Sequence, residues 1–239
     1  GKNAKYVVIA GGYNDMAYSY DTIKNKVYET VKKAQRLYPD AKILVGMTGD
    51  ATSDHSRFKN VIQAYKDGTK EAGGFYITNS EYALNENKKY FASDGYHPNV
   101  KGHQAIGETI GGYLMKCEDI RVHSYATTIT IGAGTYATSN GHFINTTGIY
   151  HNYYMVDGIV DQSISGAIKY EGEYYKVDAG EVDISYTGSW TYNGTTYYLI
   201  NGHTNKNMNG PVKNKGYWYY VKNGLVINKN TVVYFNGDW

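Results

Sequence analysis

The stretch 6–12 (YVVIAGG) decides the fold of the first part of the chain. A continuous apolar run that ends in glycines is typical of a strand buried on both faces of a parallel sheet. Two further runs, 42–47 (KILVGM) and 75–77 (FYI), have the same character. Helical segments separate the three runs, so residues 1 to about 116 predict an α/β unit with a parallel sheet.

The helical segments are recognised by the spacing of their apolar residues. Ile23, Val27 and Val31 recur at i, i+4 and i+8, and Asp21 can cap the helix that they define. A second helix is predicted around residues 58–65. In a third, over residues 100–114, four side chains are expected to point inward: Ala105, Ile106, Ile110 and Leu114.

From about residue 118 onward the chain is rich in Gly, Tyr, Asn and Thr and has no clear helical period. Tyrosine pairs recur along it, and four glycines follow them at a constant spacing of 22: Gly158, Gly180, Gly202 and Gly224. The period predicts tandem units of an aromatic strand, a glycine turn and a return strand, because Asn193-Gly194 and Asn223-Gly224 are strong turn dipeptides. Such hairpins bury a face only by stacking on each other. We expect an α/β unit at 1–117, a β-rich connector at 118–147 and repeats at 148–239.

Composition excludes several classes of protein. The 239 residues are 41% hydrophobic and 19% charged, which argues against a disordered chain. The formal net charge is only +2, which argues against a nucleic-acid binder. No apolar run approaches the ~20 residues of a membrane span. The single cysteine, Cys117, excludes an internal disulfide and a cysteine-based zinc cluster.

Two short motifs in the first part carry chemistry. Residues 12–15 (GYND) follow the first predicted strand, and residues 94–98 (DGYHP) precede the last predicted helix. Open α/β sheets place their sites at the carboxyl ends of the strands, where both motifs fall. Together the motifs resemble the third and fifth sequence blocks of the SGNH, or GDSL-type, hydrolases, which read G-x-N-D and D-x-x-H-P. The resemblance covers roughly residues 1–116 and implies a flavodoxin-like, three-layer α/β fold.

The resemblance also implies the roles of four residues. His97 would be the general base of a Ser-His-Asp triad, and Asp94 would hold its imidazole in the right tautomer. Asn14 would donate its side-chain NH₂ to the oxyanion, helped by the backbone N–H of Gly12. Gly12 is expected to be a glycine because a side chain would block the approach of the ester. No cofactor is implied.

The chain departs from the family at the nucleophile. The family's serine lies in a Gly-Asp-Ser block upstream of G-x-N-D, and eleven residues before Gly12 leave no room for it. We interpret Gly49-Asp50-Ala51 as a decoy, since alanine stands in place of the serine. Without the two strands that go with this block, strand 6–10 would be an exposed edge. We therefore expect the chain to be a fragment with an incomplete N-terminal side of the sheet, and a truncation at residues 234–239, which stop in mid-strand.

Other interpretations of the polar residues are less favoured. His97 and His103 would suggest a metal, but no cysteine or second acid completes a site. We expect His103 to be a helix residue near the loop and His55 to be a solvated loop residue. Ser53 or Ser56 as a replacement nucleophile is disfavoured, because neither lies on the strained turn that this role requires.

The repeats resemble the aromatic-glycine repeats of Gram-positive surface proteins, as in residues 219–224 (YYVKNG). Those are the choline- and glucan-binding repeats that attach enzymes to cell walls or polysaccharide. Exposed rings could stack on sugars or cationic groups. The candidate ligand residues are Trp190, Tyr197, Tyr198, Trp218, Tyr219 and Tyr220. The alternative is that the rings only form the core, and with three tryptophans the chain departs from the pattern of a choline-type cage.

These observations predict a secreted or surface SGNH-type esterase joined to a wall- or glycan-binding repeat array. Its substrate would be an ester such as an O-acetyl group on a carbohydrate, and its partners would be cell-wall or surface polysaccharides, with no nucleic acid and no membrane span. The alternative is a non-catalytic adhesin or phage-tail receptor-binding protein with a degenerate scaffold. A purely structural surface spacer is a third and weaker hypothesis.

Overall fold

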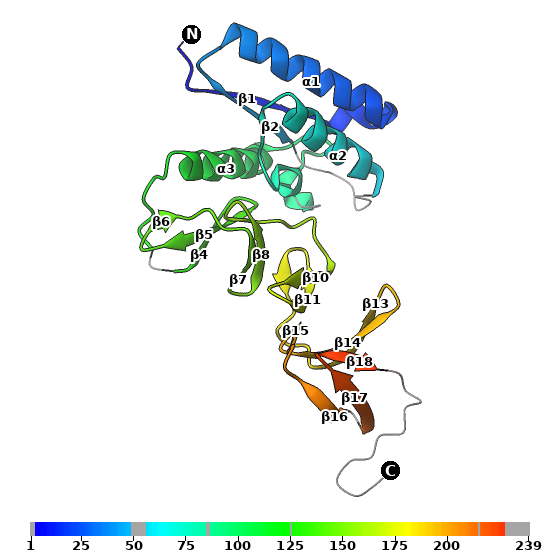
Figure 1. Ribbon diagram of the computed structural model, residues 1–239. Coiled ribbons are helices and arrows are strands. Elements are labelled where there is room, and N and C mark those ends of the chain that lie inside the picture. Colours follow the sequence, from blue (N-terminus) through cyan, green and yellow to red (C-terminus); the bar gives the residue numbers. More distant parts are fainter. Residues whose placement is uncertain (1–2, 49–55, 85–86, 125, 215, 228–239) are drawn as a thin grey trace, which may run out of the picture. The chain divides into compact units, whose positions relative to one another are not determined.

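A computed structural model describes residues 3–48, 56–84, 87–124, 126–214 and 216–227 (Figure 1). The chain divides into two compact units, Gly1–Phe143 and Ile144–Trp239, which are described separately. The division falls within the segment 118–147 that the sequence marked as a connector. In the described residues no helix is long and apolar enough to cross a membrane. The predicted strand at 234–239 lies outside the described residues.

The first unit contains the predicted parallel sheet. Its three strands pair in the order β1-β2-β3, with Ile9 beside Val45 and Val45 beside Tyr76. The elements of the sheet and its helices are β1 (Tyr6–Gly11), α1 (Tyr20–Leu37), β2 (Lys42–Met47), α2 (Ser56–Glu71), β3 (Phe75–Tyr76) and α3 (Val100–Cys117). The alternation of strands and helices confirms the α/β interpretation of the sequence.

Strand β1 is less buried than the sequence indicated. In β2 every residue from Ile43 to Met47 is buried, whereas in β1 Val8 is 39% exposed. The prediction that residues 6–10 are buried on both faces was therefore wrong. Among the described residues β1 is an edge strand that pairs only with β2, and its exposed residues Val8 and Ala10 alternate with half-buried Val7 and Ile9, so one face of this strand is left open.

Helix α1 packs with its predicted stripe but begins differently. Ile23, Val27 and Val31 are buried in the core of the first unit. The N-cap is Ser19, whose Oγ accepts a hydrogen bond from the Thr22 N–H at 3.3 Å. Asp21, which we expected to cap the helix, lies in its first turn, where a carboxylate is favoured by the helix dipole.

Helix α3 buries a different face from the one predicted. Ala105 is buried, but the other three predicted residues, Ile106, Ile110 and Leu114, are only half-buried. The buried face consists of Gly102, Ala105, Thr109, Gly112 and Tyr113. Strands β4 (Thr128–Ile131), β5 (Gly134–Ser139) and β6 (His142–Phe143) follow α3, and β4 and β5 contact it.

Small residues on α3 allow this close approach. A Cβ atom at Gly112 would lie 2.9 Å from the Ile131 Cβ and 3.0 Å from the Tyr136 hydroxyl. The Thr109 hydroxyl accepts a hydrogen bond from the Ala133 N–H at 3.0 Å. Part of the segment 118–147 therefore packs as a β-hairpin on the α/β unit.

The second unit is an antiparallel array of repeated three-stranded units. Each unit is a hairpin followed by a short return strand, which confirms the predicted tandem hairpins. The strands are β7 (Gly148–Tyr150), β8 (Tyr153–Val156), β9 (Ile159–Val160), β10 (Gly166–Tyr170), β11 (Glu173–Asp178), β12 (Glu181–Val182), β13 (Gly188–Tyr192), β14 (Thr195–Ile200), β15 (His203–Thr204), β16 (Asn209–Asn214), β17 (Tyr217–Lys222) and β18 (Leu225–Ile227). The turn residues Asn193 and Gly194 have φ values of 48° and 77°, as a tight hairpin turn requires.

Successive units are joined in a constant register. In three units the first residue of the return strand pairs with a tyrosine of the preceding hairpin: Glu181 with Tyr153, His203 with Tyr175 and Leu225 with Tyr197. A second contact also repeats. A Cβ at Gly166 would lie 2.4 Å from the Tyr192 hydroxyl of the next hairpin, so the glycine makes room for the ring.

Candidate functional site

The loop after β1 holds the first pair of candidate residues. Gly12 is buried and has a φ of 104°, a conformation that side chains other than glycine rarely adopt. A Cβ at this position would lie 3.0 Å from the Met47 Cε and 3.2 Å from its Cγ. The backbone conformation and the nearby Met47 side chain therefore both require glycine here. These are two reasons besides the predicted one, that a side chain would block the ester.

Asp15 secures this loop to α2. Its carboxylate accepts a hydrogen bond from the Tyr65 hydroxyl at 2.7 Å, and its N–H donates to the Gly12 carbonyl at 3.1 Å. Tyr65 is buried, and burial together with this bond raises the pKa of its hydroxyl. The sequence motifs assign Asp15 no role, because no local pattern links it to a residue fifty positions away.

The donors predicted for an oxyanion lie free on this loop. Asn14 is exposed, and its side chain has no hydrogen-bond partner within the described residues. The N–H of Gly12 likewise has no acceptor in that part of the chain. Two uncommitted donors on a fixed loop can serve a ligand oxygen.

The second pair of candidate residues lies on the loop before α3. The His97 Nδ1 is 2.7 Å from the Asp94 Oδ2. The other carboxylate oxygen, Oδ1, accepts the backbone N–H groups of Tyr96 at 2.9 Å and His97 at 3.0 Å. These two backbone bonds, followed by the bond to the His97 ring, hold the pKa of Asp94 well below its usual range. The structure thus brings together the predicted carboxylate and imidazole, with Nε2 of an 83% exposed side chain directed away from the bond.

Asn99 fixes the same loop at its other end. Its side-chain NH₂ donates to the carbonyls of Lys89 and Phe91, both at 2.8 Å. Its Oδ1 accepts the N–H groups of Lys101 and Gly102 and so caps α3. One side chain therefore joins the helix start to the chain that precedes the Asp94–His97 loop.

The remaining candidates do not join either group. No hydrogen bond or ion pair links Asn14 to His97 in the described residues, so each pair is positioned by its own loop. His103 is exposed on α3. Gly49-Asp50-Ala51, Ser53 and His55 lie outside the described residues. Within the described part of the chain, no group of three or more His, Cys, Asp or Glu residues could hold a metal ion.

A separate groove lies between helix α1 and the face of the sheet that α1 covers. It has a volume of about 430 Å³ and lies between β1, β2 and α1. Its lining is mostly apolar and includes Ile9, Val27, Val31 and Val45, together with Tyr65 of the Asp15 contact. The groove is therefore lined in part by the residues that hold the loop of Asn14, and neither Asp94 nor His97 lines it.

The candidate aromatic residues of the repeats differ widely in exposure. Tyr197 and Tyr198 are only 6% and 5% exposed, so they belong to the core of the array. Trp190 is half-buried and its ring lies 5.4 Å from the Tyr192 ring. Tyr219 and Tyr220 are also half-buried, whereas Trp218 is 64% exposed. Of the six predicted ligand residues, Trp218 is the one whose ring is open to solvent.

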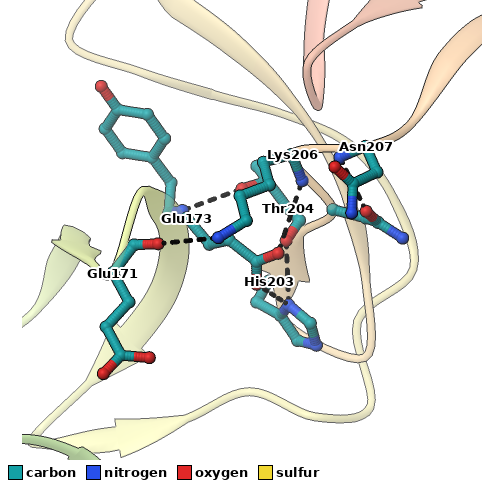
Figure 2. Close-up of polar contacts among 8 residues, drawn as sticks. Glu171, Glu173, His203, Thr204, Lys206 and Asn207 are labelled. Atoms are coloured by element: carbon teal, nitrogen blue, oxygen red, sulfur yellow. Dashed lines mark hydrogen bonds and ion pairs between the residues drawn. The ribbon is translucent and has the colours of Figure 1, made fainter.

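Polar contacts join the second and third repeats at one junction (Figure 2). The Glu173 carboxylate lies 3.0 Å from the His203 Nδ1 and accepts the Lys206 N–H at 3.4 Å. The Thr204 hydroxyl accepts the Tyr174 N–H at 2.8 Å, and the Lys206 ammonium donates to the Glu171 carbonyl at 3.3 Å. These polar groups are therefore engaged in contacts between the two repeats.

Comparison with known proteins agrees with the α/β interpretation. The sequence model of the GDSL-like Lipase/Acylhydrolase family matches residues 1–105, so this part of the chain is similar to that family. No curated protein matches the chain.

Two solved structures show partial likeness. A GDSL-like lipase from Parabacteroides merdae is 18% identical with a TM-score of 0.35; the match covers 47% of this chain and 59% of the lipase. Choline binding protein F from Streptococcus pneumoniae is 20% identical with a TM-score of 0.28; that match covers 48% of this chain and 40% of the other. Because both TM-scores are low, neither likeness adds to the assignment.

Proposed function

We propose, from the GDSL-like character of residues 1–105, that the first unit is the base-bearing part of an acyl-ester hydrolase. The observation that carries this proposal is the contact of 2.7 Å between the His97 Nδ1 and the Asp94 Oδ2. A carboxylate in this position selects the tautomer whose Nε2 can accept a proton. The exposed Nε2 is therefore available to a nucleophile and its ester.

In the proposed reaction His97 takes the proton of a serine hydroxyl as that oxygen attacks the ester carbonyl. Asp94 stabilises the imidazolium that forms, and His97 then returns the proton to the leaving alcohol. The side-chain NH₂ of Asn14 and the N–H of Gly12 would bind the oxyanion of the tetrahedral intermediate. One such donor is worth about 3–4 kcal/mol of barrier.

The serine would come from a Gly-Asp-Ser block that this sequence does not contain. The open edge of β1, which pairs only with β2 among the described residues, offers its backbone groups to further strands of the sheet. A strand added at this edge would also end near the loop of Gly12, because parallel strands end at the same side of a sheet.

The second unit would hold the enzyme at a cell wall or surface polysaccharide, outside the cell. The support is the repeated hairpin with the exposed Trp218, a ring that can stack on a sugar. An ester on a surface carbohydrate, such as an O-acetyl group, is then the substrate class that both units fit. The origin in a Gram-positive organism is part of the same proposal and rests on the resemblance of the repeats.

The test is hydrolysis of p-nitrophenyl acetate by two polypeptides: the 239-residue chain and a longer one that carries the Gly-Asp-Ser block ahead of Gly1. We expect activity in the longer polypeptide only. His97→Ala should lower kcat by about 10³–10⁴-fold and Asn14→Ala by about 10²–10³-fold. His103→Ala, which removes an exposed imidazole six residues away, should leave activity unchanged.

The second candidate is a binding protein with a degenerate α/β scaffold. The observation that supports it is the repeat array of the second unit, where Trp218 is 64% exposed. Folded polypeptides of both lengths without activity would support this candidate and contradict the general base. Equal losses in His97→Ala and His103→Ala would instead indicate non-specific imidazole hydrolysis.

A further inference from the structure

Charge is divided unevenly along the repeats. Residues 157–183 contain seven Asp or Glu and two Lys. Residues 184–237 contain five Lys and no Asp or Glu. The formal net charge of the whole chain, +2, does not reveal that the first of these segments is acidic and the second basic. The hairpin of β16 and β17 lies wholly in the basic part.

One face of that hairpin combines lysines with aromatic rings. The strand register places Lys213 opposite Trp218, Pro211 opposite Tyr220 and Asn209 opposite Lys222. Because alternate pairs of an antiparallel ladder share a face, these six residues lie on one side of the hairpin. The other side holds Val221, which is fully buried, and Tyr219, whose ring lies 6.2 Å from that of Tyr198.

The side with the lysines therefore faces solvent. Lys213, Trp218 and Lys222 are all exposed. The two lysines stand at pairs that are four residues apart, which is about 13 Å along a strand. Pro211 and Tyr220 lie between the two lysines, and Trp218 lies opposite Lys213. These three side chains provide the apolar surface of this face.

In the described part of the repeats, neither of these lysines donates a side-chain hydrogen bond. Lys206 of the same basic part is engaged at the repeat junction, where its ammonium donates to the Glu171 carbonyl (Figure 2). Lys213 lies over the Trp218 ring at 5.7 Å from its centroid. In the described residues neither Lys213 nor Lys222 has a carboxylate partner.

The pair of Lys213 and Trp218 can be compared with the pairs at the same position in the two preceding hairpins. The register places Lys169 opposite Tyr174 in the hairpin of β10 and β11, with the ammonium 5.6 Å from the ring centroid. There, however, Glu171 and Glu173 lie beside the pair in the sequence. In the hairpin of β13 and β14 the same pair is Thr191 and Thr196.

We propose that the face of Lys213, Trp218 and Lys222 binds an anionic polysaccharide, with a sugar ring on Trp218 and acidic groups at the two lysines. This inference rests on the proposed glycan-binding role of the repeats and names the class of ligand. A quaternary ammonium such as choline is disfavoured, because the Lys213 ammonium, 5.7 Å from the centroid of the Trp218 ring, would repel a second cation, whereas a sugar ring carries no positive charge. Carboxylates of uronic acids and phosphates of a polyol-phosphate polymer share the chemistry that the lysines recognise.

The test is calorimetric titration of the 239-residue chain with four probes: a decamer of galacturonic acid, a glycerol-phosphate oligomer, neutral dextran and choline chloride. We expect binding of an acidic polymer, with a Kd that rises when NaCl is increased from 50 to 300 mM, because salt screens exposed charges. Choline should not bind at this face. The stronger of the two acidic polymers identifies carboxylate or phosphate as the source.

Variants locate the binding. The double change Lys213→Ala and Lys222→Ala should raise the Kd by about five- to twentyfold, and Trp218→Ala by about tenfold. Lys169→Ala is the matched control in the acidic repeat and should change the Kd less than twofold. These side chains are exposed, and far-UV circular dichroism verifies that the variants fold.

Dextran binding that is as strong as that of the acidic polymers would overturn the inference and leave the proposed glycan binding intact. Affinity unchanged by the double variant, or displacement by choline, would also overturn it. If no polymer binds at all, both the inference and the glycan-binding role fail, while the esterase assay is unaffected.

Discussion

The two units of this protein position their candidate sites in different ways. In the first unit the site depends on contacts that occur once: Asp94 with His97, Asn99 with the start of α3, and Asp15 with Tyr65. In the second unit a geometry that recurs every 22 residues builds the scaffold, and the candidate ligand face lies where one repeat differs from the others. Function is thus expected at unique contacts in one unit and at departures from the period in the other.

Asp94→Asn should separate chemistry from folding and have the largest effect. Asparagine keeps an oxygen that can accept the backbone N–H groups of Tyr96 and His97, so the loop retains its shape. It cannot hold the imidazole in the required tautomer or stabilise its charged form. In the longer, nucleophile-bearing polypeptide we expect kcat for p-nitrophenyl acetate to fall by about 10²–10⁴-fold with little change in KM.

The first unit offers a matched control for this change. Asp119 also contacts a histidine, since its Oδ2 lies 3.2 Å from the His142 Nδ1, and both are exposed. Asp119→Asn should leave kcat unchanged. An equal loss of activity in both variants would assign the effect of Asp94→Asn to general destabilisation.

Gly166→Ala should have the opposite effect: it should destabilise the second unit and leave the esterase reaction unchanged. Its φ of 121° is unfavourable for alanine, and the new Cβ would meet the Tyr192 hydroxyl at 2.4 Å. We expect the free energy of unfolding of the second unit to fall by about 2–4 kcal/mol. Thermal unfolding followed by circular dichroism measures the loss, and esterase activity of the longer polypeptide should persist.

Gly210→Ala sharpens this test, because Gly210 occupies the same position in a later repeat. Its φ is 109°, but a Cβ there meets nothing within 4 Å. The cost should therefore be only about 1–2 kcal/mol, from the backbone alone. Equal losses in the two variants would show that the Tyr192 ring does not pack on Gly166.

Periodic features of the fold could be predicted from the sequence. The buried stripe of α1 and the 22-residue units follow from spacing, which depends only on neighbours along the chain. The face of α3 was predicted wrongly because burial there is decided by close packing of β4 and β5 against glycines, which favours Gly112 over the larger Ile110. The contact of Asp15 with Tyr65 is equally a product of the folded chain.

The sequence motifs predict the candidate site more fully than they predict the packing of the elements around it. Asp94 and His97 are three residues apart, so a local turn is sufficient to bring them together, as the structure has it. The repeat aromatics were a weaker prediction, because a tyrosine has the same sequence pattern whether it is buried like Tyr197 or exposed like Tyr217. Sequence spacing gives the face of a strand but not the neighbour that covers it.

Asn99→Ala should have a moderate effect on the first unit. The variant removes the N-cap of α3 and the donors to the Lys89 and Phe91 carbonyls. The expected loss is about 1–2 kcal/mol in the free energy of unfolding, measured by urea denaturation. Asn99→Asp is the control, because it keeps the cap and removes only the NH₂ group. If Asn99→Asp were as damaging as Asn99→Ala, the cap would not contribute.

The smallest expected effect is the pH dependence of the stability that Asp94 contributes. Its pKa is held below the ordinary value, first by the backbone N–H groups of His97 and Tyr96 and then by the His97 ring. A carboxylate with a depressed folded-state pKa stabilises the fold above its unfolded pKa of about 3.9, and this contribution is lost as the pH falls through the folded value. The difference in melting temperature between the natural chain and Asp94→Asn should therefore be constant from pH 7 to about pH 5 and shrink between about pH 4 and pH 2. A difference that stays constant down to pH 2 would mean that the charge of Asp94 does not contribute to the stability of the loop.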